Sequence, residues 1–338
     1  MGKKLRNFTV AVLSVAAFMT LINVVPPAKS VAGVNPFIRK ENEKVMIAAH
    51  RGGSDTNPEN TLLAYRAAVN EYKVDILESD LYLTKDGYLV YNHDSYIDET
   101  CNVNGDISEE EMKALIKDKS KRHYIEDYTL EELQQYNFGY YFKDKEGNRP
   151  YKDLTHDEVI EKGLQILEVE DLFKEFYETN KDLLFIVEIK NSKERGYEAC
   201  DKLASALNKY EEYKDQIVIG TFNPEIETYL KENYALLHRG ASTAGAAGFV
   251  LTELLKVNLF DTNKFSCLQV PMSYDIKGIE IKLDKKAYID RAHKRNIAVQ
   301  YWTINDKDEM KYLMDLGCDA IMTDDLDASK EVIEEYYK

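Results

Sequence analysis

Residues 74–82 read Val-Asp-Ile-Leu-Glu-Ser-Asp-Leu-Tyr, an apolar run that carries acidic side chains near its end. From residue 43 onward, similar short apolar runs alternate with amphipathic stretches whose apolar residues have helical spacing. Eight alternating pairs exceed what a doubly wound sheet usually needs and match a closed (β/α)₈ barrel, the TIM barrel, of roughly 250 residues. The expected strands are 45–49, 74–80, 184–189, 216–220, 235–238, 266–270, 297–303 and 319–323. The expected helices are 61–72, 169–177, 196–210, 224–232, 246–258, 285–296, 306–316 and 328–337.

The chain is longer than such a barrel needs, and the excess falls in one place. Residues 96–165 are rich in Tyr, Lys, Asp and Glu and contain no strong strand run. We therefore expect a barrel domain over 43–338 with a small insertion subdomain at 96–165, between the second strand and its helix.

Residues 1–32 have the pattern of a signal peptide or an N-terminal membrane anchor. Basic residues at 3–6 precede an apolar stretch over 8–25, and small residues at positions 28, 30 and 32 have signal-peptidase spacing. The stretch is only just long enough to span a bilayer, so export is favoured over permanent anchoring. Both alternatives predict an extracytoplasmic body, secreted or anchored to the outer face of the cytoplasmic membrane. This segment could also bring the protein into contact with the membrane.

The charge balance excludes one class of partner. The 338 residues hold 44 Lys and Arg against 60 Asp and Glu, a formal net charge of −16. A protein that binds nucleic acid replaces condensed cations with its own basic side chains, and no basic stripe offsets the acidity here. We expect no nucleic-acid partner.

The first expected strand runs directly into His50, Arg51 and two glycines. Side chains at the carboxyl ends of barrel strands converge on one mouth, where these folds place catalysis. A capping or core histidine is the alternative, but a guanidinium beside it is not cheaply buried without an anionic partner. His50 and Arg51 are therefore expected to face an anionic group such as a phosphate.

Carboxylates end the next two expected strands. Glu78 and Asp80 are two residues apart, so in an extended chain they point to the same side, and Glu188 interrupts the third apolar run. A hard divalent ion with oxygen ligands satisfies such a cluster. Ion pairs are the alternative, and Lys190 shares the face of Glu188. The three carboxylates together favour a metal.

Two further side chains are expected at the mouth. An Asp86-Gly87 turn returns the chain to His93, beside the carboxylates. A second histidine there suggests an acid and a base. Trp302, the single Trp, follows the seventh strand and is expected to pack on a substrate's carbon skeleton. His238, at the end of the fifth strand, ranks below these residues.

These motifs together resemble the glycerophosphodiester phosphodiesterase family over residues 45–330. In chain order they are His50-Arg51-Gly52, Pro58-Glu59-Asn60-Thr61, Glu78-x-Asp80, Leu83-Thr84-Lys85-Asp86-Gly87, His93-Asp94, Val187-Glu188-Ile189-Lys190, Trp302-Thr303-Ile304-Asn305 and Leu316-Gly317-x-Asp319-Ala320-Ile321-x-Thr323-Asp324.

The resemblance implies a barrel with an insertion after its second strand. It also implies hydrolysis of glycerophosphodiesters to an alcohol and glycerol 3-phosphate. One divalent metal, Ca²⁺ or Mg²⁺, would be held by Glu78, Asp80 and Glu188.

The same resemblance assigns the remaining roles. His50 and His93 would form the acid–base pair; within that pair, our own interpretation takes His50 as the base and His93 as the acid. Arg51 and Lys190 would bind the phosphate, and Glu59 would support the metal site.

Two alternatives stay open. One is a related phospholipase D-type hydrolase acting on lysophospholipids or glycerophosphate polymers. The apolar segment 249–257 could border an acyl lane for it, although packing on the barrel explains this segment equally well. The other is a non-catalytic extracellular binding module. It is disfavoured because a decayed site would have lost at least one of the five histidines and carboxylates.

Overall fold

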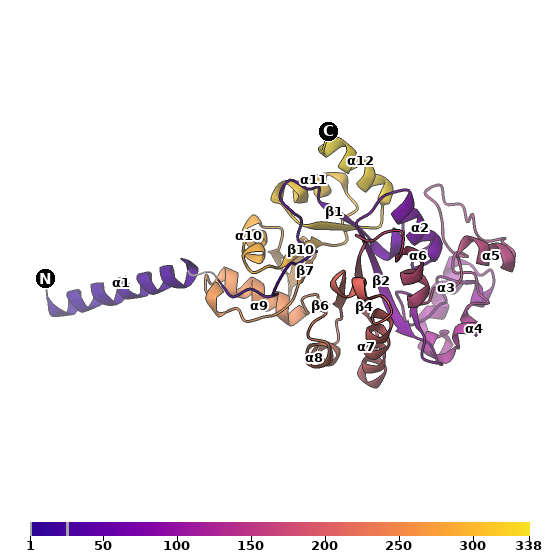
Figure 1. Ribbon diagram of the computed structural model, residues 1–338, viewed down its shortest axis with the longest axis horizontal. Coiled ribbons are helices and arrows are strands. Elements are labelled where there is room, and N and C mark those ends of the chain that lie inside the picture. Colours follow the sequence, from indigo (N-terminus) through magenta and orange to yellow (C-terminus); the bar gives the residue numbers. More distant parts are fainter. Residues whose placement is uncertain (1, 25–26) are drawn as a thin grey trace.

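Eight parallel strands form a closed barrel in the computed structural model, which describes residues 2–24 and 27–338 (Figure 1). The order around the barrel is β6-β5-β4-β2-β1-β11-β10-β7, and a parallel bridge between Gly240 and Cys267 joins the two ends. The predicted (β/α)₈ barrel is confirmed. The strands are β1 Met46–Ala49, β2 Ile76–Leu83, β4 Leu184–Ile189, β5 Ile217–Gly220, β6 His238–Arg239, β7 Cys267–Val270, β10 Ala298–Tyr301 and β11 Ala320–Thr323.

Side chains along each strand point alternately into the barrel and toward the helices, and so build two apolar layers. Ile76 belongs to the cluster inside the barrel, whereas its neighbour Leu77 belongs to the larger cluster between the strands and the helices. Barrel strands are buried on both faces, which is why they read as nearly continuous apolar runs.

Eight helices cover the outside of the barrel. Local capping fixes several starts: the Thr61 hydroxyl accepts a hydrogen bond from the Ala64 N–H, and Ser242 does the same for Gly245. The helices are α2 Leu62–Asn70, α6 Val169–Phe176, α7 Lys193–Leu207, α8 Pro224–Asn233, α9 Thr243–Leu254, α10 Lys286–Lys294, α11 Lys307–Leu316 and α12 Leu326–Tyr336.

The segment between β2 and α6 forms a separate lobe beside the barrel (Figure 1). Strand β3 (Leu89–Tyr91) pairs antiparallel with β2, and the lobe then holds α3 (Glu109–Lys117), α4 (Leu130–Leu133) and α5 (His156–Lys162). Its own small apolar cluster is made by Val90, Ile97, Cys101, Ile125, Leu133, Phe138 and Ile166. Its independence as a subdomain stays a prediction.

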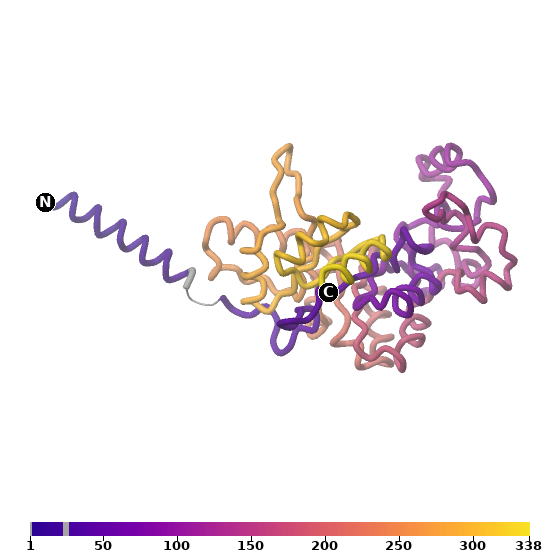
Figure 2. Tube along the Cα trace, turned by 90° about the horizontal axis from the view of Figure 1, so that it is seen from above, coloured from indigo at the N-terminus to yellow at the C-terminus, as the bar shows by residue number. Residues whose placement is uncertain are grey.

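Two local expectations differ from the structure. The strand expected at 235–238 is β6, which begins only at His238 because α8 ends at Asn233 and a turn follows. An antiparallel hairpin, β8 (Ser273–Ile276) with β9 (Ile279–Lys282), was not anticipated. It projects from the barrel after β7, as the orange hairpin in Figure 2 shows.

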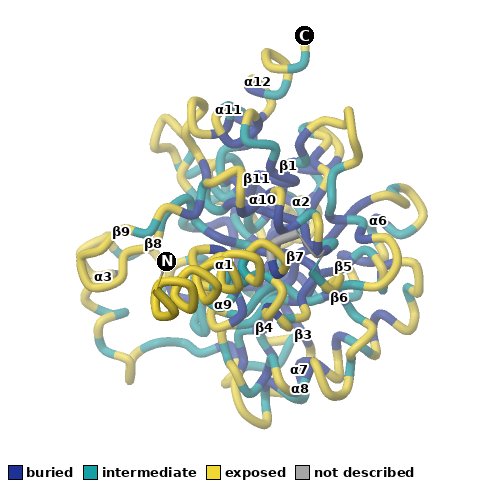
Figure 3. Tube along the Cα trace, turned by 90° about the vertical axis from the view of Figure 1, so that its left-hand side faces the viewer, coloured by how far each residue is buried: buried dark blue, intermediate teal, exposed yellow. Residues whose placement is uncertain are grey.

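Helix α1 (Lys3–Val24) extends away from the body and is exposed along almost its whole length (Figure 3). Its segment Lys3–Ile22 is the one helix in the described part of the chain that is long and apolar enough to cross a membrane.

The chain after α1 packs against the barrel. The Ser30 hydroxyl donates to the Phe265 carbonyl at 2.6 Å, and the Asn35 amide donates to the Ser266 carbonyl at 2.8 Å. Phe37 is fully buried inside the barrel, N-terminal to the boundary expected at residue 43.

Candidate active site

The turn after β1 is shaped to present His50 and Arg51. Arg51 has a φ of 53°, and Gly52 and Gly53 also have positive φ. A Cβ on Gly53 would lie 2.6 Å from the side chain of Leu326, so only glycine fits there. The unusual Arg51 backbone directs its N–H to Glu78 Oε2 at 2.9 Å.

Strand pairing brings the three predicted carboxylates to one place. Asp80 on β2 is the register partner of Glu188 on β4. Lys190 Nζ lies 3.0 Å from Asp80 Oδ1 and 3.1 Å from Glu188 Oε2. The lysine therefore bridges these two carboxylates, as the ion-pair alternative anticipated.

Arg51 makes a second set of ion pairs. Its Nη1 lies 3.0 Å from Glu59 Oε2, and its Nε lies 3.6 Å from Asp80 Oδ2. Across residues 2–24 and 27–338, no three His, Cys, Asp or Glu side chains converge on a point suited to a metal ion. The expected ligand set is thus interleaved with two cationic side chains.

The site still carries unneutralised negative charge. Three carboxylates, those of Glu59, Asp80 and Glu188, share the two cations Arg51 and Lys190. Glu78 accepts from the Arg51 N–H and lies 3.9 Å from His50 Nε2. Asp80 Oδ2 is buried without a hydrogen-bond partner. Burial and the charge of Asp80 raise the pKa of Glu78 to about 8. A cation beside Glu78 and Asp80 would relieve both features.

His50 is held by an acid that sequence reasoning did not single out. Its Nδ1 lies 2.6 Å from Asp324 Oδ1, which also accepts a hydrogen bond from the Ser54 hydroxyl at 2.6 Å. Asp324 Oδ2 accepts from the Asn305 amide at 2.9 Å. Burial opposes the charge of Asp324, but the hydrogen bonds and His50 lower its pKa to about 2. An ionised carboxylate only accepts, so Nδ1 carries the proton and Nε2 points to Glu78, 3.9 Å away.

The contact between His50 and Asp324 also changes the pKa of the imidazole. Burial lowers the pKa of His50, but the hydrogen bond to Asp324 and the charge of Glu78 outweigh it, so the pKa is raised above its usual value. The imidazole is thus oriented by one carboxylate and faces a second.

Eight of the nine predicted site residues line a single cavity of about 360 Å³ at the barrel mouth. They are His50, Arg51, Glu78, Asp80, His93, Glu188, Lys190 and Trp302. Glu59 is not in the lining and contacts it through Arg51. His93 is about one third exposed, and its Nδ1 lies 3.6 Å from Asp94 Oδ2.

Two lower-ranked candidates do not lie at the mouth. His238 lies at the start of β6, where its Nδ1 is 2.8 Å from the Ser266 hydroxyl and its ring packs on Phe37, so it does not reach the mouth. The segment 249–257 does not line the cavity, because Phe249 is buried in the outer layer and the rest lies on the outside of the barrel. Phe222 lines the cavity instead.

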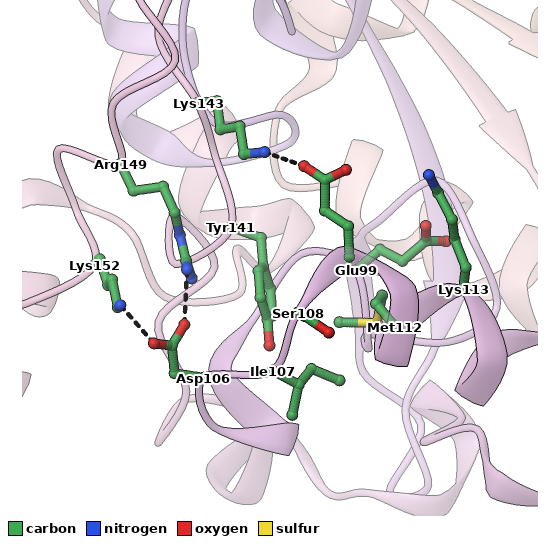
Figure 4. A pocket seen from close by; sticks show the side chains of 11 residues that line it. Glu99, Asp106, Ile107, Ser108, Met112, Lys113, Tyr141, Lys143, Arg149 and Lys152 are labelled. Atoms are coloured by element: carbon green, nitrogen blue, oxygen red, sulfur yellow. Dashed lines mark hydrogen bonds and ion pairs between the residues drawn. The ribbon is translucent and has the colours of Figure 1, made fainter.

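A larger cavity, of about 660 Å³, lies in the insertion (Figure 4). Three of its four cationic groups are already paired with acids: Arg149 and Lys152 contact Asp106 at 2.8 and 2.6 Å, and Lys143 contacts Glu109. It has no histidine and none of the predicted residues. The barrel mouth is therefore the candidate active site.

Sequence comparison places this geometry in a family. Residues 50–328 match the glycerophosphoryl diester phosphodiesterase family. The chain belongs to this family. Its enzyme class is therefore that of a glycerophosphodiester phosphodiesterase, a phosphoric diester hydrolase. A glycerophosphodiester phosphodiesterase of Caldanaerobacter subterraneus is 25% identical over 282 residues, which cover 83% of this chain and 95% of that protein.

Solved structures agree on the fold. A putative glycerophosphoryl diester phosphodiesterase from Silicibacter pomeroyi has a TM-score of 0.65 at 15% identity, covering 90% of this chain and 99% of its own. A phosphodiesterase from Oleispira antarctica, solved with the product sn-glycerol-3-phosphate, has a TM-score of 0.58 at 17% identity, covering 87% and 97%. Both structural similarities show the barrel fold.

Proposed function

We propose that this phosphodiesterase hydrolyses glycerophosphodiesters to an alcohol and glycerol 3-phosphate, with His50 and His93 as its acid–base pair and a divalent metal at the barrel mouth. The observation that carries the proposal is the convergence of two histidines, two cations and three carboxylates on one cavity of about 360 Å³. The product bound to the Oleispira antarctica enzyme supports the same substrate class.

His50 is the better base. Asp324 holds the proton on Nδ1, which leaves the lone pair of Nε2 free to accept a proton from the attacking hydroxyl. His93, on the loop after β3, lines the same cavity and donates a proton to the departing alcohol.

Arg51 and Lys190 supply positive charge to the substrate. A phosphodiester is anionic and repels a nucleophile, so charge gathering on its non-bridging oxygens must be neutralised. Both side chains line the cavity and are now held by carboxylates. Trp302, in the same lining, offers a flat apolar surface for the carbon skeleton.

The donor set fits a hard divalent ion. Glu78, Asp80 and Glu188 offer only oxygen ligands, Asp80 Oδ2 makes no hydrogen bond, and burial beside Asp80 raises the pKa of Glu78, which a nearby cation would lower. When bound, Ca²⁺ or Mg²⁺ would supply Lewis-acid stabilisation of phosphoryl oxygens. Glu59, through Arg51, supports this side of the site.

One observation favours a lipid-like second substrate. Phe222 lines the cavity and is 63% exposed, so an apolar chain leaving the mouth would find a surface there. Lysophospholipids are therefore the second candidate class.

The location outside the cytoplasmic membrane also remains our proposal. Its support is α1 together with the contacts of the chain that follows. Ser30 is hydrogen-bonded to Phe265 in both directions, and a signal peptidase acting after residue 30 or 32 would remove it. These contacts favour retention of α1 as an anchor on the outer face. The acidity of the chain continues to argue against nucleic acid.

Release of glycerol 3-phosphate tests the function. The purified protein is assayed with glycerophosphocholine, glycerophosphoethanolamine, a glycerophosphate oligomer and lysophosphatidylcholine, with a chelator and with added Ca²⁺ or Mg²⁺. We expect metal-dependent release from the small diesters and its loss in His50→Ala. Full activity of that variant, or equal activity in chelator, would refute the proposed mechanism.

A further inference from the structure

A cluster of large apolar side chains lies exposed on the outside of the barrel, away from the active site. We call it the α9–η6 patch, after α9 and the short 3₁₀ helix η6 (Asn258–Phe260). Its members are Leu251, Leu254, Leu255, Leu259 and Phe260. Four of the five are more than half exposed, and Leu259 is 37% exposed. Large exposed apolar side chains gathered on two contacting elements of a folded protein mark a contact site.

The patch follows from the helical pattern of α9. Gly245, Phe249 and Glu253, spaced four residues apart, are buried on the face toward the barrel. Leu251 and Leu254 lie on the other side of the helix, where polar residues are usual. The helix is therefore apolar on both faces, and only one face has a partner within the barrel.

Helix α1 leaves the body at this patch. Helix α1 contacts η6, and Ile22 is buried although residues 3–18 of the helix are exposed. Figures 1 and 3 both show α1 departing beside α9. The segment that could cross a membrane, Lys3–Ile22, therefore has its C-terminal end next to the exposed apolar side chains.

The connection between α1 and the body is fixed by hydrogen bonds. Lys264 Nζ donates to the Lys29 carbonyl at 2.6 Å, and the Ser30 N–H donates to the Arg295 carbonyl at 2.7 Å. Arg295 is fully buried and also donates to the Asn263 carbonyl at 2.6 Å. The chain is thus attached to the body directly beside the patch.

Exposed lysines lie beside the patch, although the chain as a whole is acidic. Lys29 and Lys264 are exposed, and Lys256 pairs with Glu253. The acids within 251–264 are Glu253 and Asp261; both are buried, and Asp261 pairs with Arg291. Such a local excess of lysine around apolar side chains is complementary to anionic lipid headgroups.

We propose that the α9–η6 patch docks onto the surface of an anionic lipid bilayer beside α1. The leucines and Phe260 enter the headgroup boundary, and the lysines lie at its surface. The body is then held at one orientation on the membrane, where a tether alone would leave it free to rotate. This proposal concerns attachment, and it stands or falls independently of the catalytic assignments.

Site-specific labelling of the full chain tests the proposal. The four native cysteines are buried, so a new surface cysteine is labelled selectively with an environment-sensitive fluorophore. Leu254→Cys reports on the patch. Ile160→Cys on α5 is the matched control, because Ile160 is likewise about half exposed but lies at the end of the molecule opposite α1 (Figure 1). Val12→Cys reports insertion of α1.

Each labelled protein is reconstituted into vesicles made of equal amounts of phosphatidylcholine and phosphatidylglycerol, with and without brominated acyl chains. We expect quenching at positions 254 and 12 and little at 160, and weaker quenching at 254 in phosphatidylcholine alone. Quenching at 12 with 254 no different from 160 overturns the proposal, as does the absence of quenching at all three. A spectral shift at 254 that depends on protein concentration without vesicles also overturns it, in favour of a second copy of the chain.

Discussion

Replacement of Asp324 by Asn is the sharpest test of the site, because the neighbouring hydrogen bonds dictate how the new amide must sit. The Asn305 carbonyl oxygen accepts from the Thr323 hydroxyl at 2.9 Å and from the Asp324 N–H at 3.0 Å. Asn305 therefore cannot flip, and its NH₂ group must keep donating toward residue 324. The oxygen of the new amide takes that side, and its NH₂ group faces His50.

The imidazole then has to change tautomer. With a donor opposite Nδ1, that nitrogen becomes the acceptor and the proton moves to Nε2, which can no longer act as a base. Loss of general-base catalysis costs about 10²–10⁴ in rate, or about 2.7–5.4 kcal/mol of transition-state stabilisation. Asp324 does not line the cavity, so KM is expected to change little.

The assay is steady-state release of glycerol 3-phosphate, with thermal unfolding to show that the variant is folded. Asp325→Asn is the matched control. Asp325 caps α12 and pairs with Lys145, and Asn is an equally good cap, so the rate should stay near that of the wild type. A folded Asp324→Asn enzyme with a rate within about threefold of wild type would refute the assignment of His50 as the oriented base.

Three further outcomes are expected. A chelator should abolish turnover. Glu188→Gln should raise the Ca²⁺ or Mg²⁺ concentration needed for half-maximal activity by at least about tenfold. An unchanged metal titration of that variant would contradict a ligand role for Glu188. His93→Ala should slow hydrolysis of glycerophosphocholine by a factor of about 10²–10⁴. It should slow hydrolysis of a p-nitrophenyl diester far less, because p-nitrophenolate departs without a proton. Equal losses on both substrates would contradict the assignment of His93 as the acid. Phe37→Ala should lower the free energy of unfolding by about 3–5 kcal/mol in urea titrations; a change near zero would show that Phe37 is not part of the barrel core.

The barrel could be predicted because its strands are buried on both faces. Runs such as Leu184–Ile189 are apolar without interruption except where a functional acid replaces a core residue. The hairpin β8–β9 escaped prediction although Lys277-Gly278 is a turn signal, because its apolar face is exposed and alternates with charges. Short elements without a buried face have little to distinguish them from loops.

The site residues could be chosen from their positions at strand ends, but their pairings could not. Asp324 follows the last strand and is visible in the sequence, yet its contact with His50 depends on β11 lying next to β1. Likewise, the position of Lys190 between Asp80 and Glu188 depends on the exact register of two strands. Spacing along a chain shows which side chains share a mouth, and only the fold shows which of them touch.

The core of the protein begins before the region that matches the family. The family match starts at residue 50, whereas β1 and Phe37 precede it. Because β1 lies between β2 and β11, a fragment trimmed to the matched region would expose two open strand edges and leave the floor of the barrel unfilled. Unpaired edges invite aggregation, so we expect soluble truncated forms of this enzyme to require the chain from about residue 27.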